Sequence, residues 1–156
     1  FIVLFDGMNF DTYTAKTELH YSRCVRGNSY FSNDFVDNGN NSISDQNTGL
    51  MWQKTESGTL NWEQAISYCN DLTLAGNNDW RLPTIIELQH LMDFSTNQPA
   101  MDTTFFPNAG IYYNWSSTTI PFDSTRAYEI NAGYGNITAS LKASNYHNVR
   151  CVSSGQ

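Results

Sequence analysis

The chain has 156 residues and a formal net charge of −7, with eight basic and 15 acidic side chains, which argues against nucleic acid or an anionic membrane as a partner. Hydrophobic residues make up 40% and aromatic residues 14% of the sequence, and this excludes a disordered chain. No apolar run approaches the ~20 residues that a membrane-spanning helix needs, so we expect no membrane insertion. The chain begins with Phe1 and shows no signal-peptide pattern, so we expect a mature or excised piece of a protein.

The two ends of the chain resemble each other. The segment His20–Val25 matches His147–Val152 at four of six positions, which are the histidine, the arginine, the cysteine and the valine. We therefore predict that residues 1–27 are terminal strands that resemble the end of a preceding repeat, and that residues 28–156 form the next full copy. The alternative is a chance similarity between two short β-hairpins.

Two helices are predicted in the middle of the chain. The first covers residues 62–73, where apolar side chains recur at helical spacing, and Asn61 and Gln64 form a capping box at its start. The second begins after Thr84, which has Glu87 as its capping-box partner.

Short strand patterns surround the helices and are separated by Gly, Asn and Pro turns. They lie at residues 50–52, 80–82, 112–119, 127–132, 137–141 and 149–152. Together with the helices, they predict an α+β fold in which two helices pack on a mostly antiparallel sheet.

An oxygen-rich segment at residues 37–45 is the weak candidate for a metal site. Asp37, Asn41 and Asp45 carry the hard oxygen ligands that calcium favours. The segment departs from the EF-hand pattern because no glutamate closes it. The alternative is an Asn-rich turn whose side chains bond the local backbone.

Catalytic motifs are missing from the sequence. It contains neither a G-x-S-x-G elbow nor an H-E-x-x-H helix, and its three histidines follow no metal-ligand spacing. We expect a protein that is not an enzyme and that needs no cofactor.

Aromatic and amide side chains in predicted turns are the candidate ligand-binding residues. Flat aromatic rings stack on sugar rings, and amides form hydrogen bonds with sugar hydroxyls. The candidates are Tyr112, Tyr113, Asn114, Tyr134, Asn145, Tyr146 and His147. The alternative is that these side chains face the core or support the turns.

Five ordered motifs resemble a known family. They are Thr48–Gln53, Trp62–Cys69, Asp79–Leu88, Trp115–Ser117 and Val149–Val152. With them, about residues 36–152 resemble the C-terminal domain family of the Legionella collagen-like protein, whose fold is similar to that of C-type lectins. The resemblance implies an α+β, C-type lectin-like domain.

The resemblance also implies a disulfide bond. The family pairs a cysteine of the first helix with one of the last strand, which here are Cys69 and Cys151. Three cysteines are an odd number, so Cys24 is left as a free thiol or as the partner of a cysteine in another chain.

The resemblance further implies an extracellular or cell-surface protein that functions in recognition or adhesion. The expected ligand is a glycan or a protein surface. A sulphated glycosaminoglycan, which the family suggests, needs a basic patch, and the net charge of −7 favours a neutral glycan instead. The alternative is a structural subunit that self-associates through strand contacts.

Overall fold

The computed structural model describes residues 34–96, 98–143 and 147–155. All of them belong to the second of two units of the chain, Phe31–Gln156. The predicted repeat end at residues 1–27 and the candidate ligand residues Asn145 and Tyr146 lie outside the described residues. The domain boundary at residue 28 therefore stays a prediction.

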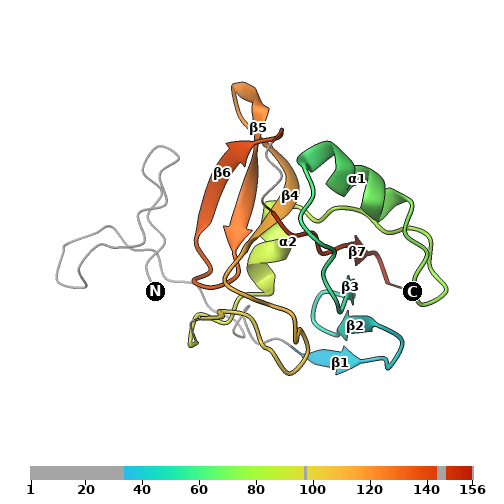
Figure 1. Cartoon of the computed structure of the whole chain (residues 1–156). Helices are drawn as coiled ribbons and strands as arrows, with labels where there is room; N and C mark the ends of the chain where they lie inside the picture. The colour runs from blue at the N-terminus through green and yellow to red at the C-terminus, as the bar shows by residue number, and fades with distance from the viewer. Residues whose placement is uncertain (1–33, 97, 144–146, 156) are drawn as a thin grey trace. The chain divides into compact units, whose positions relative to one another are not determined.

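Two antiparallel sheets and two helices make up the described part of the chain (Figure 1). The elements are β1 (Phe35–Asp37), β2 (Ser42–Asp45), β3 (Met51–Gln53), α1 (Trp62–Asn70), α2 (Ile85–His90), β4 (Tyr113–Ile120), β5 (Asp123–Asn131), β6 (Ile137–Leu141) and β7 (Val152–Ser153). One sheet has the order β1-β2-β3-β7 and the other the order β4-β5-β6. This confirms the α+β architecture, which consists mostly of sheet. Within the described residues, no helix is long and apolar enough to cross a membrane.

Both helices begin at the predicted caps. The Asn61 side chain accepts a hydrogen bond from the Gln64 backbone N–H, and the Gln64 side chain accepts one from the Asn61 N–H. Thr84 and Glu87 form the same reciprocal pair at the start of α2. These caps satisfy donors that the first helical turn leaves without partners.

Helix α1 is shorter than predicted. It ends at Asn70, three residues before the predicted end at residue 73. The Leu72 N–H bonds the Cys69 carbonyl in a tighter turn, and Leu74 and Asn77 then pair with each other in a bridge. These local hydrogen bonds redirect the chain before a further helical turn can form.

The predicted strands at residues 80–82 and 149–152 are mostly irregular. In the first, Arg81 alone pairs, in a bridge with Val152. The second belongs to a stretch, residues 147–152, that we call the C-terminal segment. It pairs with two sheets in turn, because Asn148 bridges Asn114 of β4 and Val152 pairs with β3. A segment that changes partners in this way cannot form a long ladder with either sheet.

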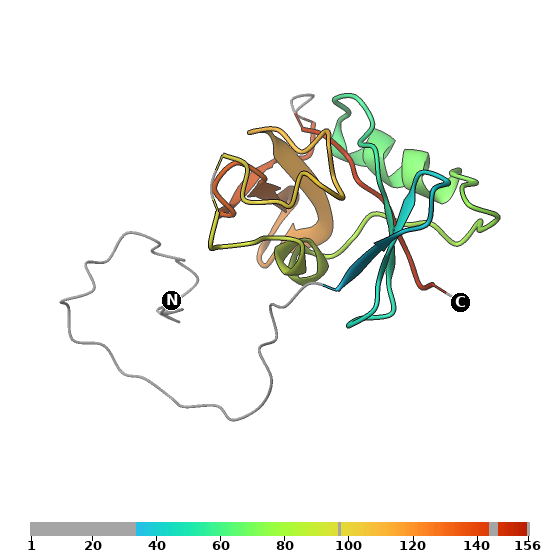
Figure 2. The same ribbon diagram turned by 90° about the horizontal axis from the view of Figure 1, so that it is seen from below.

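The C-terminal segment lies between α1 and α2 in both views (Figures 1 and 2), where it is coloured red. Its side chains enter two hydrophobic clusters. Val149 and Cys151 pack in the cluster that contains residues of α1, whereas Val152 packs in the cluster that contains residues of α2. Trp115 is fully buried in the first of these clusters, as its predicted place in a strand implies. The segment therefore connects the two halves of the core.

The turn between β4 and β5 carries an unusual residue. Phe122 follows Pro121, has a φ angle of 66°, and is fully exposed. The left-handed backbone region is unfavourable for a side chain of this size. An aromatic ring is thus held in solvent on a strained turn.

Candidate functional site

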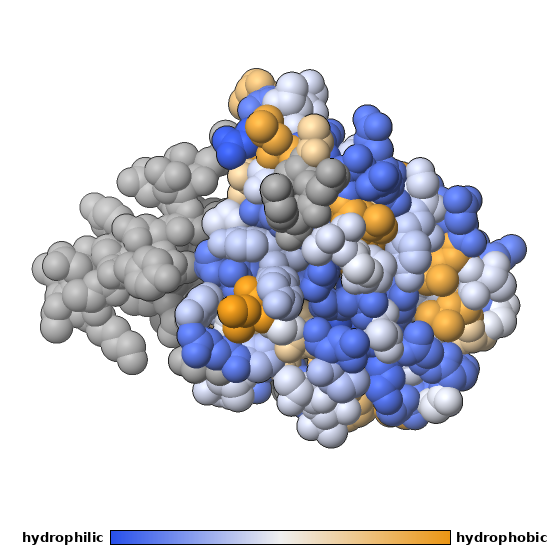
Figure 3. Space-filling model, in the orientation of Figure 1, coloured by the Kyte–Doolittle hydropathy of each residue, from blue (hydrophilic) through white to orange (hydrophobic). Residues whose placement is uncertain are grey.

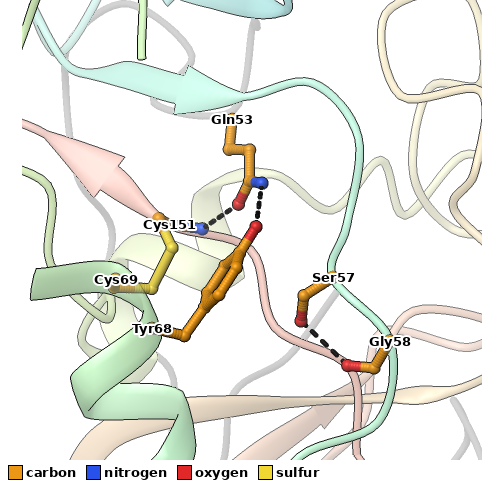
Figure 4. The surroundings of a disulfide bond; sticks show 6 residues. All are labelled: Gln53, Ser57, Gly58, Tyr68, Cys69 and Cys151. Carbon is orange, nitrogen blue, oxygen red and sulfur yellow. Dashed lines mark hydrogen bonds between the residues drawn. A yellow bond between two sulfur atoms is a disulfide. The ribbon is translucent and has the colours of Figure 1, made fainter. Parts of the chain in front are cut away.

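A disulfide bond joins α1 to the C-terminal segment (Figure 4). The Cα atoms of Cys69 and Cys151 lie 5.5 Å apart, and both residues are fully buried. The Gln53 side chain accepts a hydrogen bond from the Cys151 N–H at 3.2 Å and donates one to the Tyr68 hydroxyl at 2.7 Å. The pairing that the family resemblance implied is therefore confirmed, whereas Cys24 lies outside the described residues.

Arg150 is buried beside this disulfide. Its Nη2 donates to Oε1 of Glu56 at 2.9 Å, and its Nη1 donates to the carbonyls of Gln53 at 2.7 Å and Lys54 at 2.6 Å. The guanidinium carbon lies 4.6 Å from the centroid of the Phe106 ring. Burial lowers the pKa of Arg150, and the carboxylate of Glu56 opposes that effect. Arg150 is therefore a structural cation and does not face a ligand.

A second buried pair joins the C-terminal segment to β5. Nε2 of His147 lies 2.8 Å from Oε2 of Glu129, and Oε1 of Glu129 accepts hydrogen bonds from Thr138 and Ser140, both at 2.9 Å. Burial raises the pKa of Glu129, but His147 and the two hydroxyls outweigh it and lower that pKa. The imidazole lies edge-on to Trp115 at 4.3 Å. His147, a candidate ligand residue, thus faces the interior.

Two further candidates lie on β4. Asn114 is 1% exposed, because its backbone pairs with Ile130 on one side and Asn148 on the other. Its side-chain amide has no hydrogen-bond partner in the described part of the chain. Tyr113 is half-buried, with its ring 5.7 Å from that of His147. Asn114 is therefore inaccessible to a ligand, and Tyr113 is only partly accessible.

Three exposed side chains form what we call the aromatic patch: Ile111, Tyr112 and Tyr134. Their exposed fractions are 59%, 60% and 55%. The Ala132 N–H donates to the Tyr112 carbonyl at 2.9 Å, and a Cβ on Gly133 would lie 3.1 Å from the Ile111 Cα. The two segments therefore pack directly against each other, and glycine permits this close approach.

The Tyr134 ring is anchored at its hydroxyl. Nε2 of Gln98 donates a hydrogen bond to that hydroxyl, and the Gln98 N–H donates to the Gly133 carbonyl at 2.7 Å. Oδ1 of Asn131 accepts hydrogen bonds from the Gly133 N–H at 2.8 Å and the Tyr134 N–H at 3.2 Å. The ring is held at both ends while more than half of the residue stays exposed.

Sequence reasoning predicted Tyr112 and Tyr134 but missed Ile111 and Gln98. Ile111 directly precedes the predicted tyrosines, so its position was a usable signal. Gln98 comes from a distant loop, and no local pattern connects it to Tyr134. The structure places both tyrosines at the surface, on two segments that pack against each other.

The stretches of sequence that carry the patch contain no lysine or arginine. The sequence contains no lysine or arginine between Arg81 and Arg126. Elsewhere in the described residues, three basic side chains are held in ion pairs: Lys54 with Asp37, Arg81 with Glu87, and Arg150 with Glu56. On the face shown in Figure 3, hydrophobic residues form small separate areas among hydrophilic ones.

The weak calcium candidates do not converge. In the register of β1 and β2, Asp37 and Asp45 stand at opposite ends of the paired segment. Asp37 accepts from the Gly39 N–H and from Lys54, and Asp45 accepts from the residues of its own turn. Oδ1 of Asn41 accepts from the Thr55 hydroxyl at 2.7 Å. In the residues that the structure describes, no group of three His, Cys, Asp or Glu side chains is placed to hold a metal ion.

Comparison with family models connects this geometry to known proteins. The model of the Lcl C-terminal domain matches residues 41–153. The chain belongs to this family. The match includes both cysteines of the disulfide, both buried acid–base pairs and the aromatic patch. The Lcl family is a secreted or surface type, which indicates a surface or adhesion-type protein. A comparison with curated proteins gave no match.

Proposed function

We propose that this Lcl domain is a noncatalytic extracellular recognition domain that binds a glycan through the aromatic patch. The observation that carries the proposal is the exposed ring of Tyr134, which Gln98 holds at its hydroxyl, on a segment that packs against the segment of the exposed Tyr112. A ring held in place by Gln98 loses little conformational freedom when a sugar stacks on it. Membership of the Lcl family, which indicates a surface or adhesion-type protein, supports this proposal.

A neutral glycan is the ligand class that fits this surface. Sulphated sugars are held mainly by arginine and lysine, which present several donors to each sulphate group. The chain from residue 82 to residue 125 has no such side chain. Tyrosine rings and the amide of Gln98 instead offer stacking faces and hydrogen-bonding groups, which suit uncharged hydroxyl-rich rings.

The proposal that the domain is noncatalytic rests on where its acid–base groups lie. The side chains of Glu129 and His147 are 4% and 7% exposed, and those of Arg150 and Glu56 are 0% and 4% exposed. General acid–base catalysis requires such groups within hydrogen-bonding reach of a substrate. Closed off from solvent, both pairs lie out of reach of a substrate.

We also propose that the arrangement is C-type lectin-like. Two features support this. The last strand, β7, pairs with β3 in the sheet that also contains β1. Both helices come after β3 and before β4 in the chain. The disulfide between α1 and the C-terminal segment is a further point in favour.

A glycan array probed with the full chain tests the proposed function, with and without calcium. Saturable binding to neutral glycans is expected, with loss of binding in Tyr134→Ala and Tyr112→Ala. Phe122→Ala is the matched control, because it removes an exposed aromatic ring outside the patch. Gln98→Ala should weaken binding less than Tyr134→Ala, because it frees the ring without removing it. Unchanged binding in Tyr134→Ala, or an array without a neutral hit, would refute the proposal.

A second candidate function is a structural subunit. Strand β6 pairs with β5 on one side, and within the described residues no strand pairs with its other edge. Such an edge can accept a strand of another subunit. Sedimentation velocity over a range of concentrations tests this, because a subunit of this kind assembles as its concentration rises. A chain that stays monomeric throughout that range excludes it.

A further inference from the structure

The outer edge of β6 has no partner strand among the described residues. The opposite edge of the same sheet is covered, because Asn148 accepts a hydrogen bond from the Trp115 N–H and donates one to the Tyr113 carbonyl. The other sheet ends at β1, which has only three residues and carries the charge of Asp37. Short, charged edges resist pairing with other chains. The edge of β6 is therefore the one that is open to a further strand.

The register of β5 and β6 shows which backbone groups face this edge. At one end of the ladder the Lys142 N–H donates to the Thr125 carbonyl at 2.9 Å, and at the other the Asn131 N–H donates to the carbonyl of residue 136 at 2.9 Å. Bonded pairs alternate along an antiparallel ladder, so every second residue of β6 directs its N–H and carbonyl towards β5. The residues that direct these groups outwards are Ile137, Ala139 and Leu141.

Strand β6 itself carries none of the features that protect an exposed edge. It pairs with β5 through five consecutive residues without a register shift, whereas the ladder of β4 and β5 contains two shifts. Its sequence, Ile-Thr-Ala-Ser-Leu, contains no charge and no proline. The side chain of Leu141 is exposed. A regular, uncharged edge of this kind favours pairing with another strand.

A second copy of β6 fits this edge in an antiparallel register centred on Ala139. In that register Ile137 of one copy lies opposite Leu141 of the other, and Thr138 lies opposite Ser140. Apolar side chains thus meet apolar ones, and hydroxyls meet hydroxyls. Residues 137, 139 and 141 of one copy face the same three residues of the other, so their outward N–H groups and carbonyls become each other's partners.

The side chain of Arg126 occupies the centre of the same edge. Its Nη2 donates a hydrogen bond to the Ala139 carbonyl at 2.8 Å, and this carbonyl is one of the groups that face outwards. Pairing of two copies therefore competes with this bond in each copy. It also brings two guanidinium groups towards the same point, where like charges repel each other. Because Arg126 is exposed, its side chain can move into solvent when a strand arrives.

We propose that β6 binds β6 of a second copy of this chain, antiparallel and centred on Ala139, and that Arg126 limits this pairing. The inference goes beyond glycan recognition, and it rests on the second candidate function, for which it names the contact. A contact about a twofold axis is closed, so its product is a dimer. Two five-residue strands form a small interface, and small interfaces are weak. The dimer therefore forms at high protein concentration and dissociates on dilution.

Sedimentation velocity of the full chain at several concentrations measures the dissociation constant of the dimer. All chains carry Cys24→Ser, so that no dimer is linked through that thiol. Arg126→Ala should lower the dissociation constant by about tenfold, because pairing then breaks no hydrogen bond to a charged group. Lys54→Ala is the matched control, since it removes one positive charge that is paired with Asp37 and should leave the constant unchanged.

Two variants of the edge itself are combined with Arg126→Ala. Ala139→Pro removes an outward N–H and leaves the donors of the ladder with β5 in place, so the dimer should be lost while the fold is kept. Leu141→Lys places a charge on the edge and should also abolish the dimer. Circular dichroism shows which variants are folded, and Leu141→Lys alone decides if the proline prevents folding. Raising the salt concentration should strengthen the wild-type dimer more than the Arg126→Ala dimer.

Two results would overturn the proposal. One is an Arg126→Ala chain that stays monomeric at every concentration, which would also count against the structural subunit. The other is a dimer that persists unchanged in the folded edge variants, because the copies would then meet at another surface and the subunit function would stand without this contact. The glycan array is independent of both results, since the aromatic patch contains no residue of β6.

Discussion

The guanidinium group of Arg150 is enclosed in the protein, and its Nη2 atom lies 2.9 Å from Oε1 of Glu56. Neither side chain has more than 4% of its surface exposed. The charge of Arg150 is therefore balanced by one carboxylate and two backbone carbonyls instead of water. This pair holds the C-terminal segment to the chain that follows β3.

Replacement of Glu56 by alanine should destabilise the domain strongly. It leaves the Arg150 charge buried without its carboxylate, which costs about 3–5 kcal/mol in comparable cases. Urea denaturation at neutral pH measures the loss. Asp37→Ala is the control, because it removes an ion pair with Lys54 whose side chains are 38% and 26% exposed. Similar losses in the two variants would contradict the assigned role of Glu56.

Reduction of the Cys69–Cys151 disulfide should lower the free energy of unfolding by about 4.5 kcal/mol in the chain-entropy model. The two cysteines are 82 residues apart, so the bond restricts a long loop in the unfolded chain. Denaturation midpoints with and without reductant give the value. Cys24→Ser should leave the midpoint of the oxidised protein unchanged. A midpoint that is insensitive to reductant would argue against this prediction.

Glu87 should make the stability of the domain depend on acid pH. Burial raises the pKa of Glu87, but hydrogen bonds from Arg81 and Thr84 outweigh it and lower that pKa from 4.5 to about 2. The ionised carboxylate therefore stabilises the fold fully above pH 4.5, and this contribution is lost as the pH falls toward 2. Glu87→Gln should unfold more easily than the wild type at pH 7, with a difference that shrinks toward pH 2. A difference that is constant with pH would count against the prediction.

Phe122→Asn should stabilise the domain by about 1 kcal/mol. Phe122 follows Pro121 in the β4–β5 turn with a φ angle of 66°, a conformation that asparagine tolerates better. The phenyl ring is fully exposed, so its removal loses no buried contact. Thermal unfolding gives the sign of the change. Leu141→Asn is the control, because it removes an exposed apolar side chain without a positive φ angle and should have little effect. Destabilisation by Phe122→Asn would mean that the ring makes a stabilising contact.

Local features of the fold were predictable from the sequence. The capping boxes of Asn61 with Gln64 and of Thr84 with Glu87 each span four residues, so their chemistry is visible in a short window. The inward position of Cys69 in α1 follows from helical spacing for the same reason. Its pairing with Cys151 came from the family resemblance, because spacing alone does not select between the cysteines of the chain.

Features that depend on distant residues were less predictable. Asn114 and His147 resemble binding residues because they lie near aromatic residues. In the structure, β5 and the C-terminal segment bury Asn114, and His147 packs against Glu129 and Trp115. The sequence predicts one strand at residues 149–152, whereas in the structure Asn148, just before it, bridges β4 and Val152 pairs with β3. Gln98 could not be connected with Tyr134, since the hydrogen bond between them spans 36 residues.

The pairing of Trp52 in β3 with Val152 in β7 also governs how the domain folds during synthesis. Contacts between residues so far apart in sequence form late, and topologies rich in such contacts fold slowly. Until residues 151–153 have left the ribosome, β3 keeps one edge without its strand. A chain truncated before that point exposes a β-edge, which is a template for pairing with other chains and thus for aggregation.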